Sequence, residues 1–176
     1  MIQGYRTSLY SYIHELNVNV VYIYYIHCYI NIPDTSSRDS LFQAEARRCK
    51  EILDKIDNNS KDKNHFCVFD ELYSGTNPYE AVGSAYGFLK YINSINNVDF
   101  IITTHYGQLC NLMDKELNIE NKHMKIEVAD DRYNFKYTYK LAKGISSVKG
   151  GFKVLKDLNY PQSLLQTILE ISNKLN

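Results

Sequence analysis

One segment, His65 to Pro78 with the sequence HFCVFDELYSGTNP, constrains the fold of this chain more than any other. It passes from a short apolar run into two adjacent carboxylates, Asp70 and Glu71, and then into a glycine-containing turn. A short buried strand that ends in acids places them at the carboxyl edge of a sheet, where open α/β sheets bind ligands. One acid could hold a metal ion while its neighbour orients a water, which is the minimum chemistry for cleaving a nucleotide phosphate.

The residues that follow predict a crossover between two parallel strands. Asn77, Pro78 and Glu80 have the pattern of a capping box, which predicts a helix over residues 78–92. Residues 98–104 read VDFIITT, and this β-branched content predicts a second buried strand. Strand, helix and strand in this order form a right-handed parallel crossover unit, so the fold class is α/β.

Periodic stretches on either side of this unit predict the remaining elements. Apolar residues at helical spacing come before it, and alternation of polar and apolar residues comes after it. The expected elements are a helix over 9–16, a β-like run over 18–30, a helix over 39–57 capped from the polar loop 34–37, a hairpin of strands 125–128 and 133–139, and two short helices over 150–158 and 162–171.

Composition narrows the class of protein. The 176 residues are enough for one domain with a core, and 20 basic residues balance 20 acidic ones, so no net field draws the chain onto nucleic acid or an anionic membrane. The four cysteines are scattered without a CxxC pair, which favours reduced thiols over a disulfide framework or a zinc site. No apolar run reaches the roughly 20 residues of a membrane span. We therefore expect a soluble intracellular protein, cytoplasmic or nuclear, that is not secreted and has no membrane partner.

Two motifs carry a family resemblance. DELYSGTNP at 70–78 together with TTHY at 103–106 resembles the ATPase domain of the MutS family of DNA mismatch-repair proteins, a branch of the ABC-type ATPases. In that family a serine opens the helix before the acidic strand and a glutamate follows one turn later; Ser40 and Glu45 stand at the matching places here. The resemblance covers about Tyr29 to Ile171. It implies a P-loop NTPase-like parallel sheet with helices, followed by an antiparallel hairpin and a C-terminal helix pair.

The resemblance also implies roles at an ATP and Mg²⁺ site. Asp70 resembles the Walker B aspartate that holds Mg²⁺ through water, and Glu71 resembles the general base or water-orienting carboxylate. His105 resembles the switch histidine that senses the γ-phosphate. Ser40 resembles the signature serine that touches the γ-phosphate bound by the other subunit. The loop that in the family crosses the dimer interface corresponds to Ser74, Gly75, Thr76 and Asn77.

Each of these residues also has an ordinary structural interpretation. Glu71 could be a helix-capping or solvated acid, and Ser40 an ordinary serine at a helix start. A histidine at the end of a strand is often structural, and turn chemistry alone explains Gly75 and Pro78. His14, His27, His65 and His123 belong to no acid–base or metal constellation, and we interpret them as packed or surface residues.

The family's nucleotide grip, a G-x-x-x-x-G-K-[ST] loop, has no counterpart among these residues, and Gly4 to Ser8 is the nearest stretch. We therefore expect residues 1–30 to be a divergent segment in place of the P-loop region, and residues 31–176 to be the C-terminal part of a MutS-type ATPase domain. Within it, residues 150–173 would form a helix-turn-helix dimerisation element. The mismatch-binding, connector and lever domains of the family are also absent, so mismatched double-stranded DNA would be bound through domains outside this sequence.

Two hypotheses from different classes follow. In the first, the chain is a MutS-family ATPase domain in which ATP binding and hydrolysis are coupled to mismatch recognition in a homo- or heterodimer. In the second, the chain is catalytically silent and pairs with a full-length MutS-type subunit, to which it supplies Ser40 in trans, because phosphate charges without a P-loop lysine would be uncompensated. A truncated or decayed gene product and another ABC-type ATPase of DNA repair remain as alternatives.

Overall fold

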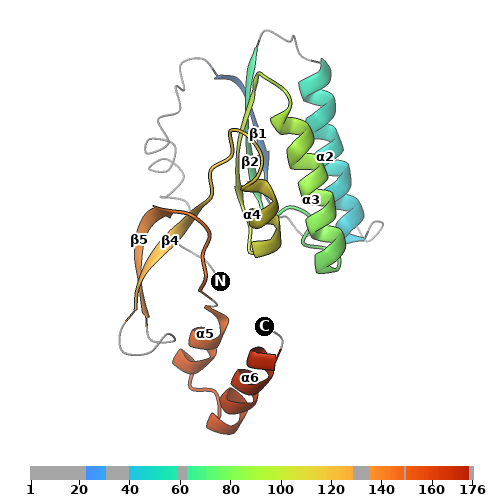
Figure 1. The fold of residues 1–176 in the computed structure, drawn as a ribbon. Coiled ribbons are helices and arrows are strands. Elements are labelled where there is room, and N and C mark those ends of the chain that lie inside the picture. The colour runs from blue at the N-terminus through green and yellow to red at the C-terminus, as the bar shows by residue number, and fades with distance from the viewer. Residues whose placement is uncertain (1–22, 31–39, 59–62, 129–134, 149, 175–176) are drawn as a thin grey trace. The chain divides into compact units, whose positions relative to one another are not determined.

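A computed structural model describes residues 23–30, 40–58, 63–128, 135–148 and 150–174 (Figure 1). The chain divides into two compact units, Met1–Leu109 and Cys110–Asn176. The described elements are β1 (Ile23–Tyr29), α2 (Leu41–Asn58), β2 (Asn64–Asp70), α3 (Pro78–Asn93), β3 (Val98–Thr103), α4 (Gly107–Met113), β4 (Lys122–Val128), β5 (Phe135–Lys143), α5 (Gly151–Asp157) and α6 (Gln162–Lys174).

The first unit contains a parallel sheet with strand order β1-β2-β3. Phe66 lies opposite Ile26 on one side and Asp99 on the other, and Asp70 lies opposite Thr103 at the end of the ladder. Helices α2 and α3 lie on the same face of the sheet, and their N-terminal ends lie at the edge where β2 and β3 end (Figure 1). Side chains that follow these strands therefore meet side chains that begin the helices.

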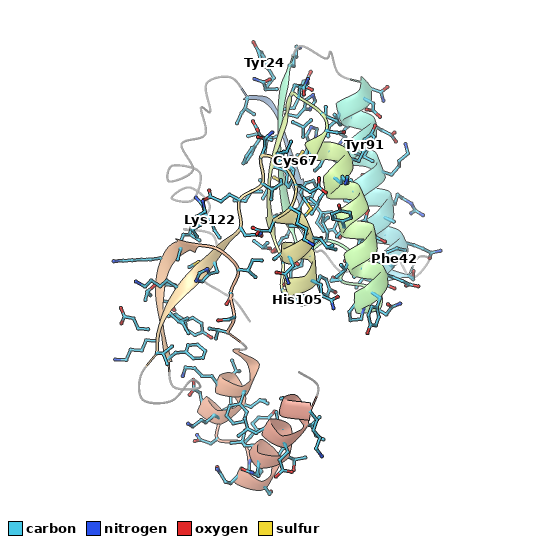
Figure 2. The ribbon with its side chains drawn as sticks, in the orientation of Figure 1. Tyr24, Phe42, Cys67, Tyr91, His105 and Lys122 are labelled. Atoms are coloured by element: carbon cyan, nitrogen blue, oxygen red, sulfur yellow. The ribbon has the colours of Figure 1, made fainter. Side chains whose placement is uncertain are left out.

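The core of this unit lies between the sheet and the two helices. Cys67 on β2 (Figure 2) and Phe69 on the same strand are fully buried. The Phe69 ring meets the edge of Phe88 on α3 with 5.3 Å between centroids. Ile52 on α2 and Leu89 on α3 are buried in the same unit. Burial raises the pKa of the Cys67 thiol to about 12, with a smaller contribution from Cys28, so this sulfur packs as a small apolar group. The central strand is thus fixed by packing on its helix side.

The second unit consists of an antiparallel hairpin of β4 and β5, followed by the short helices α5 and α6. Phe135 on β5 is buried, and the Lys153 ammonium of α5 lies 5.7 Å from its ring centroid. Leu165 on α6 is buried as well. His123 at the start of the hairpin donates to the Gly144 carbonyl at its end, with 3.0 Å between Nδ1 and the oxygen. The His123 contact thus closes the open end of the hairpin, and the Lys153 contact joins α5 to β5.

These elements confirm the predicted fold class, an α/β parallel sheet with a following hairpin and C-terminal helix pair. The expected helix over 39–57 begins at Leu41, and α4 was not predicted. The expected helix over 9–16, the first residues of the β-like run and the capping loop 34–37 lie outside the described residues. In the described part of the chain, no helix has the length and apolar character needed to cross a membrane.

Candidate active site at the carboxyl edge of the parallel sheet

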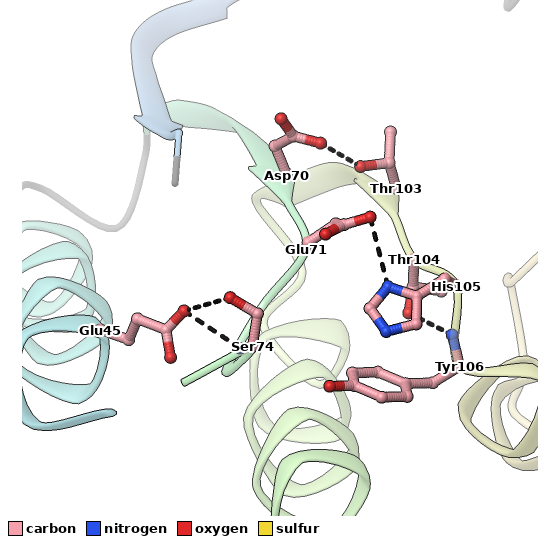
Figure 3. A network of polar contacts seen from close by, with 8 residues as sticks. All are labelled: Glu45, Asp70, Glu71, Ser74, Thr103, Thr104, His105 and Tyr106. Carbon is pink, nitrogen blue, oxygen red and sulfur yellow. Dashed lines mark hydrogen bonds and ion pairs between the residues drawn. The ribbon is translucent and has the colours of Figure 1, made fainter. Parts of the chain in front are cut away.

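Asp70 and Glu71 stand where β2 ends, directly beside the end of β3 (Figure 3). The Thr103 hydroxyl donates to Asp70 Oδ1, and the Glu71 amide donates to the Thr103 carbonyl oxygen at 3.1 Å. The Asp70 side chain is exposed on the sheet edge, with one oxygen engaged by a neutral donor. Such a carboxylate is fixed in direction and accessible to a cation.

Glu71 and His105 lie within hydrogen-bond distance across the ends of the two strands. Glu71 Oε1 lies 3.2 Å from His105 Nδ1, and the two side chains are 43% and 57% exposed (Figure 3). An ionised carboxylate can only accept, so this contact places a proton on Nδ1 and leaves Nε2 for a further partner. The pair is therefore oriented by an internal contact while it stays open to solvent.

Glu71 reaches His105 from an uncommon backbone conformation. Its φ is 53°, and Tyr73 two residues later has a φ of 58°, both in the left-handed region that side chains disfavour. Each such residue costs roughly 1–2 kcal/mol, so the surrounding structure must hold the turn. Backbone strain of this kind clusters at functional sites, so the strained turn is itself a candidate functional element.

Glu45, a buried carboxylate on α2, holds the turn from outside the strand. Its Oε1 accepts from the Ser74 amide at 3.0 Å and from the Ser74 hydroxyl at 2.8 Å (Figure 3). Its Oε2 accepts from the Gly75 amide at 3.0 Å. Hydrogen bonds to a charged group contribute roughly 1.5–3 kcal/mol each, which is enough to offset the strained residues. A side chain at Gly75 would not fit, because its Cβ would lie 2.6 Å from Leu41 Cγ.

Thr76 and Asn77 begin α3. The Asn77 side chain accepts from the amides of Tyr79 and Glu80, both at 3.1 Å, so it is the N-cap that the sequence predicted. Glu80 accepts from the Thr76 hydroxyl at 2.5 Å. These hydrogen bonds give Thr76 and Asn77 a structural role at the N-terminus of α3.

Ser40 begins α2 in the same manner. Its hydroxyl accepts from the Gln43 amide at 3.3 Å, and its own amide donates to the Gln43 side chain at 2.8 Å. This reciprocal pair is a capping box. Ser40 is exposed, and the hydrogen bonds found for it among the described residues stay within α2.

A hollow of about 330 Å³ adjoins His105 within the first unit. It is lined by the starts of α3 and α4, namely Pro78, Tyr79, Val82, His105, Tyr106, Gly107 and Gln108. Burial raises the pKa of the Tyr106 phenol, and the negative charges of Glu71 and Glu45 raise it further. Tyr106 is therefore a neutral hydrogen-bonding group beside the acids at physiological pH.

A divalent cation here would depend on few protein ligands. Among the described residues, no cluster of three or more His, Cys, Asp or Glu side chains could hold a metal ion. Mg²⁺ is typically bound through one or two carboxylates together with waters and substrate phosphates, and an exposed Asp70 suits that mode. The donor set thus fits a magnesium ion that arrives with a nucleotide.

The structure brings Asp70, Glu71 and His105 together, as the sequence leads one to expect, and it anchors Ser74 and Gly75 on α2. No sequence pattern predicted a role for Thr103 or the contacts of Glu45. Thr103 could have been found from its place at the end of the strand beside Asp70. The role of Glu45 depends on the shape of the turn, and no spacing rule encodes that shape.

Two of the histidines without a predicted role form a buried pair. His27 Nε2 lies 2.9 Å from His65 Nδ1, the two rings are stacked, and both side chains are buried. His123 bonds the hairpin, and His14 lies outside the described residues. These contacts agree with the interpretation of the described three as packed or surface residues.

A parallel α/β unit with acids and a histidine at one sheet edge, followed by a hairpin and helix pair, agrees with comparisons to known proteins. The family described as MutS domain V matches residues 7–176. MutS protein homolog 4 of Mus musculus is 30% identical over 147 residues, which is 81% of this chain and 15% of that protein. Endonuclease MutS2 of Clostridium botulinum (strain Okra / Type B1) is 30% identical over 160 residues, 89% of this chain and 19% of that protein.

The chain belongs to the MutS family, and its match is to domain V. It spans less than a fifth of the length of these relatives.

Proposed function

We propose that this chain is part of a MutS-type ATPase site that binds Mg·ATP at the carboxyl edge of its parallel sheet. The observation that supports the proposal most is the meeting of Asp70, Glu71 and His105 at the ends of two adjacent strands, with Glu71 Oε1 3.2 Å from His105 Nδ1. Membership of the MutS family supports the same substrate and cofactor. In this proposal Asp70 would hold Mg²⁺ through water, and the bound ion would supply compensation for the phosphate charge.

The protein's own groups then have distinct tasks. The Thr103 hydroxyl orients Asp70 by donating to it. Glu71 accepts a proton from the attacking water or orients that water toward the γ-phosphate. His105, fixed through Nδ1, offers Nε2 to the γ-phosphate and senses whether that group is present. The turn of Ser74, Gly75, Thr76 and Asn77 would lie at the interface with a second subunit.

A second candidate function is favoured by one sequence observation. The 176 residues contain no G-x-x-x-x-G-K-[ST] motif, whose lysine and backbone amides compensate phosphate charge in P-loop proteins. Ser40, exposed at the start of α2, could instead contact the nucleotide of a partner MutS-type subunit. The chain would then regulate its partner without hydrolysing ATP itself.

The proposed partners and setting follow from the family. We propose a MutS-family subunit as the dimer partner, with mismatched double-stranded DNA bound through parts of the assembly other than this chain. In such a dimer, residues 150–173, which comprise α5 and most of α6, would contribute to the contact between subunits. DNA as the final target places the protein in the cytoplasm or nucleus. The division into a divergent segment at 1–30 and an ATPase part from 31 onward stays a prediction.

One experiment separates the two candidates. Mg·ATP turnover is measured for the purified chain, alone and mixed with a full-length MutS relative, using Glu71→Gln and Ser40→Ala, with Glu51→Gln on the exposed side of α2 as the control. If the chain hydrolyses ATP, Glu71→Gln lowers turnover by about 10²-fold or more. If the chain acts in trans, Ser40→Ala lowers turnover of the mixture and Glu71→Gln does not. Turnover that neither substitution changes would contradict both candidates.

A further inference from the structure

Among the described residues, Glu45 is the only buried acid, and the residue is 4% exposed. It lies near the start of α2, whereas Asp70 and Glu71 stand at the end of β2. Both of its oxygens accept from the turn after β2: Oε1 from the Ser74 amide and hydroxyl, and Oε2 from the Gly75 amide. A buried carboxylate needs such donors, so the helix and the turn depend on each other.

The same turn contains the residue whose direction matters most for the proposed site. Glu71 and Tyr73 both have left-handed backbone conformations, and the first of these brings the Glu71 carboxylate within 3.2 Å of His105. Nothing in the local sequence favours this conformation, since neither residue is Gly, Asn or Asp. The constraint comes from contacts made outside the local sequence. They include the Glu71 amide bond to the Thr103 carbonyl and the hydrogen bonds that dock the turn on α2.

We propose that Glu45 is a positioning residue: by holding Ser74 and Gly75 against α2, it keeps Glu71 directed at His105. The positioning of Glu71 is inferred from the hydrogen bonds of Glu45. That this positioning matters for ATP hydrolysis rests on the proposed function.

The hydrogen bonds of Glu45 also join two parts of the proposed site. These are the start of α2, which carries Ser40, and the turn after β2, which carries Glu71. Ser40 caps the helix that carries Glu45 about one turn further along. Gly75 lies against Leu41 and Phe42, and the Phe42 and Tyr73 rings lie 5.7 Å apart. The start of α2 and the turn are therefore packed on each other, next to the hydrogen bonds of Glu45.

The test follows the His105 ring and the turn amides by NMR, on the whole chain and without nucleotide. The variants are Glu45→Gln, Glu71→Gln and the double variant, with Glu51→Gln on the same helix as the matched control. Glutamine keeps the volume but replaces one acceptor oxygen by a donor, so at least one of the three bonds is lost. Ser74→Ala, which removes only the hydroxyl, serves as a milder second variant.

If Glu45 positions Glu71, Glu45→Gln shifts the His105 imidazole nitrogen resonances in the direction that Glu71→Gln shifts them, although Glu45 does not contact the ring. In the Glu71→Gln background the same change has no further effect on those resonances. Exchange of the Ser74 and Gly75 amides becomes about tenfold faster on loss of one such bond. Glu51→Gln changes neither readout.

Two results would overturn the inference. One is a His105 resonance that stays unchanged in Glu45→Gln and in Ser74→Ala, whatever the turn amides do. The other is an equal shift in Glu51→Gln, which would indicate a general effect of helix charge. Because no nucleotide is used, failure of the ATP turnover experiment would contradict the proposed function and leave this result standing.

Discussion

His105 Nδ1 lies 3.2 Å from Glu71 Oε1, although the two residues are 34 positions apart in the chain and follow different strands. The contact exists because β2 and β3 are parallel neighbours that end at the same level, with Asp70 opposite Thr103. Parallel register thus converts two separate sequence motifs into one cluster. The same register produces a second cross-strand contact, in which the Thr103 hydroxyl donates to Asp70.

The Thr103 contact gives the first prediction. Replacing Thr103 with Val keeps the β-branched shape that the strand needs and removes only the donor to Asp70. Such a hydroxyl does not touch the metal ion but fixes the direction of the carboxylate that binds it. Loss of a group of this kind typically weakens metal affinity by about 10–100-fold. We expect the Mg²⁺ concentration for half-maximal ATP binding or turnover to rise by that factor, measured by titration in the mixed assembly.

Thr138→Val is the control for this change. Its hydroxyl donates to the Lys125 carbonyl within the hairpin of the second unit. The control should leave the Mg²⁺ dependence unaltered. A Thr103→Val chain with an unchanged Mg²⁺ requirement would remove Asp70 from the proposed metal site.

Gly75 gives the second prediction, which concerns stability. A Cβ at this position would lie 2.6 Å from Leu41 Cγ and 2.7 Å from the Phe42 backbone nitrogen, so the turn or the start of α2 would have to move. We expect Gly75→Ala to lower the free energy of unfolding by about 1–3 kcal/mol, as overpacked positions do. Urea denaturation followed by circular dichroism measures this difference.

Gly83 on α3 offers a matched comparison, because nothing lies within 4 Å of a Cβ built there. Alanine in a helix interior is preferred over glycine by roughly 0.5–1 kcal/mol, so Gly83→Ala should stabilise the chain. If both substitutions had the same sign, the close approach of the turn to α2 would not be a constraint on folding.

Much of the first unit could be predicted from the sequence because its signals are local. The strand at 64–70 and the helix at 78–93 were expected within a few residues, since an apolar run, an N-cap at Asn77 and a proline at Pro78 act over short distances. Helix α4 was not predicted because seven residues are too few to show a periodic pattern of apolar residues. Its buried face, Leu109 and Met113, is a single i, i+4 pair.

The candidate site also contains features that the sequence predicts and features that it does not. The motif residues Asp70, Glu71 and His105 could be identified from sequence, because their types and order are those of a family. The contacts of Glu45 could not, since they depend on the left-handed conformations of Glu71 and Tyr73 and on a close approach at Gly75. Long-range shape of this kind follows from packing and is not encoded in any local pattern.

The buried histidine pair gives a third prediction, on pH. Burial lowers the pKa of His27 below its usual 6.5, and His65 and Lys55 lower it further; burial also lowers the pKa of His65. Tyr25 stacks on the His65 ring, and His65 Nε2 is buried without a hydrogen-bond partner in the described structure. Because the unfolded chain binds protons more readily than the folded one, this contribution to stability is present above about pH 6.5 and is lost as the pH falls.

The measurement is the free energy of unfolding between about pH 7.5 and pH 5. The unmodified chain should lose stability over this range, and the double variant His27→Phe/His65→Phe should lose less of it. Replacing both partners by apolar rings of similar shape leaves no buried polar group unpaired. If the double variant lost stability with the same slope, the acid sensitivity would belong to other groups.

The C-terminal helices give the last prediction. Val154 on α5 and Ile171 on α6 are exposed at 51% and 48%, whereas Leu165 is buried. If this helix pair contributes to a subunit contact, Val154→Asp and Ile171→Asp place a charge in an apolar interface and should weaken association with a MutS-family subunit about tenfold or more, since truncation of central contacts costs over about 1 kcal/mol. Sedimentation velocity of the mixture gives the dissociation constant.

Ser163→Asp is the control for these changes. It adds the same charge at an exposed polar position near the start of α6, where an acid is favourable, so it should leave association unchanged. Equal weakening by all three substitutions would attribute the effect to net charge and would argue against these helices as the contact surface.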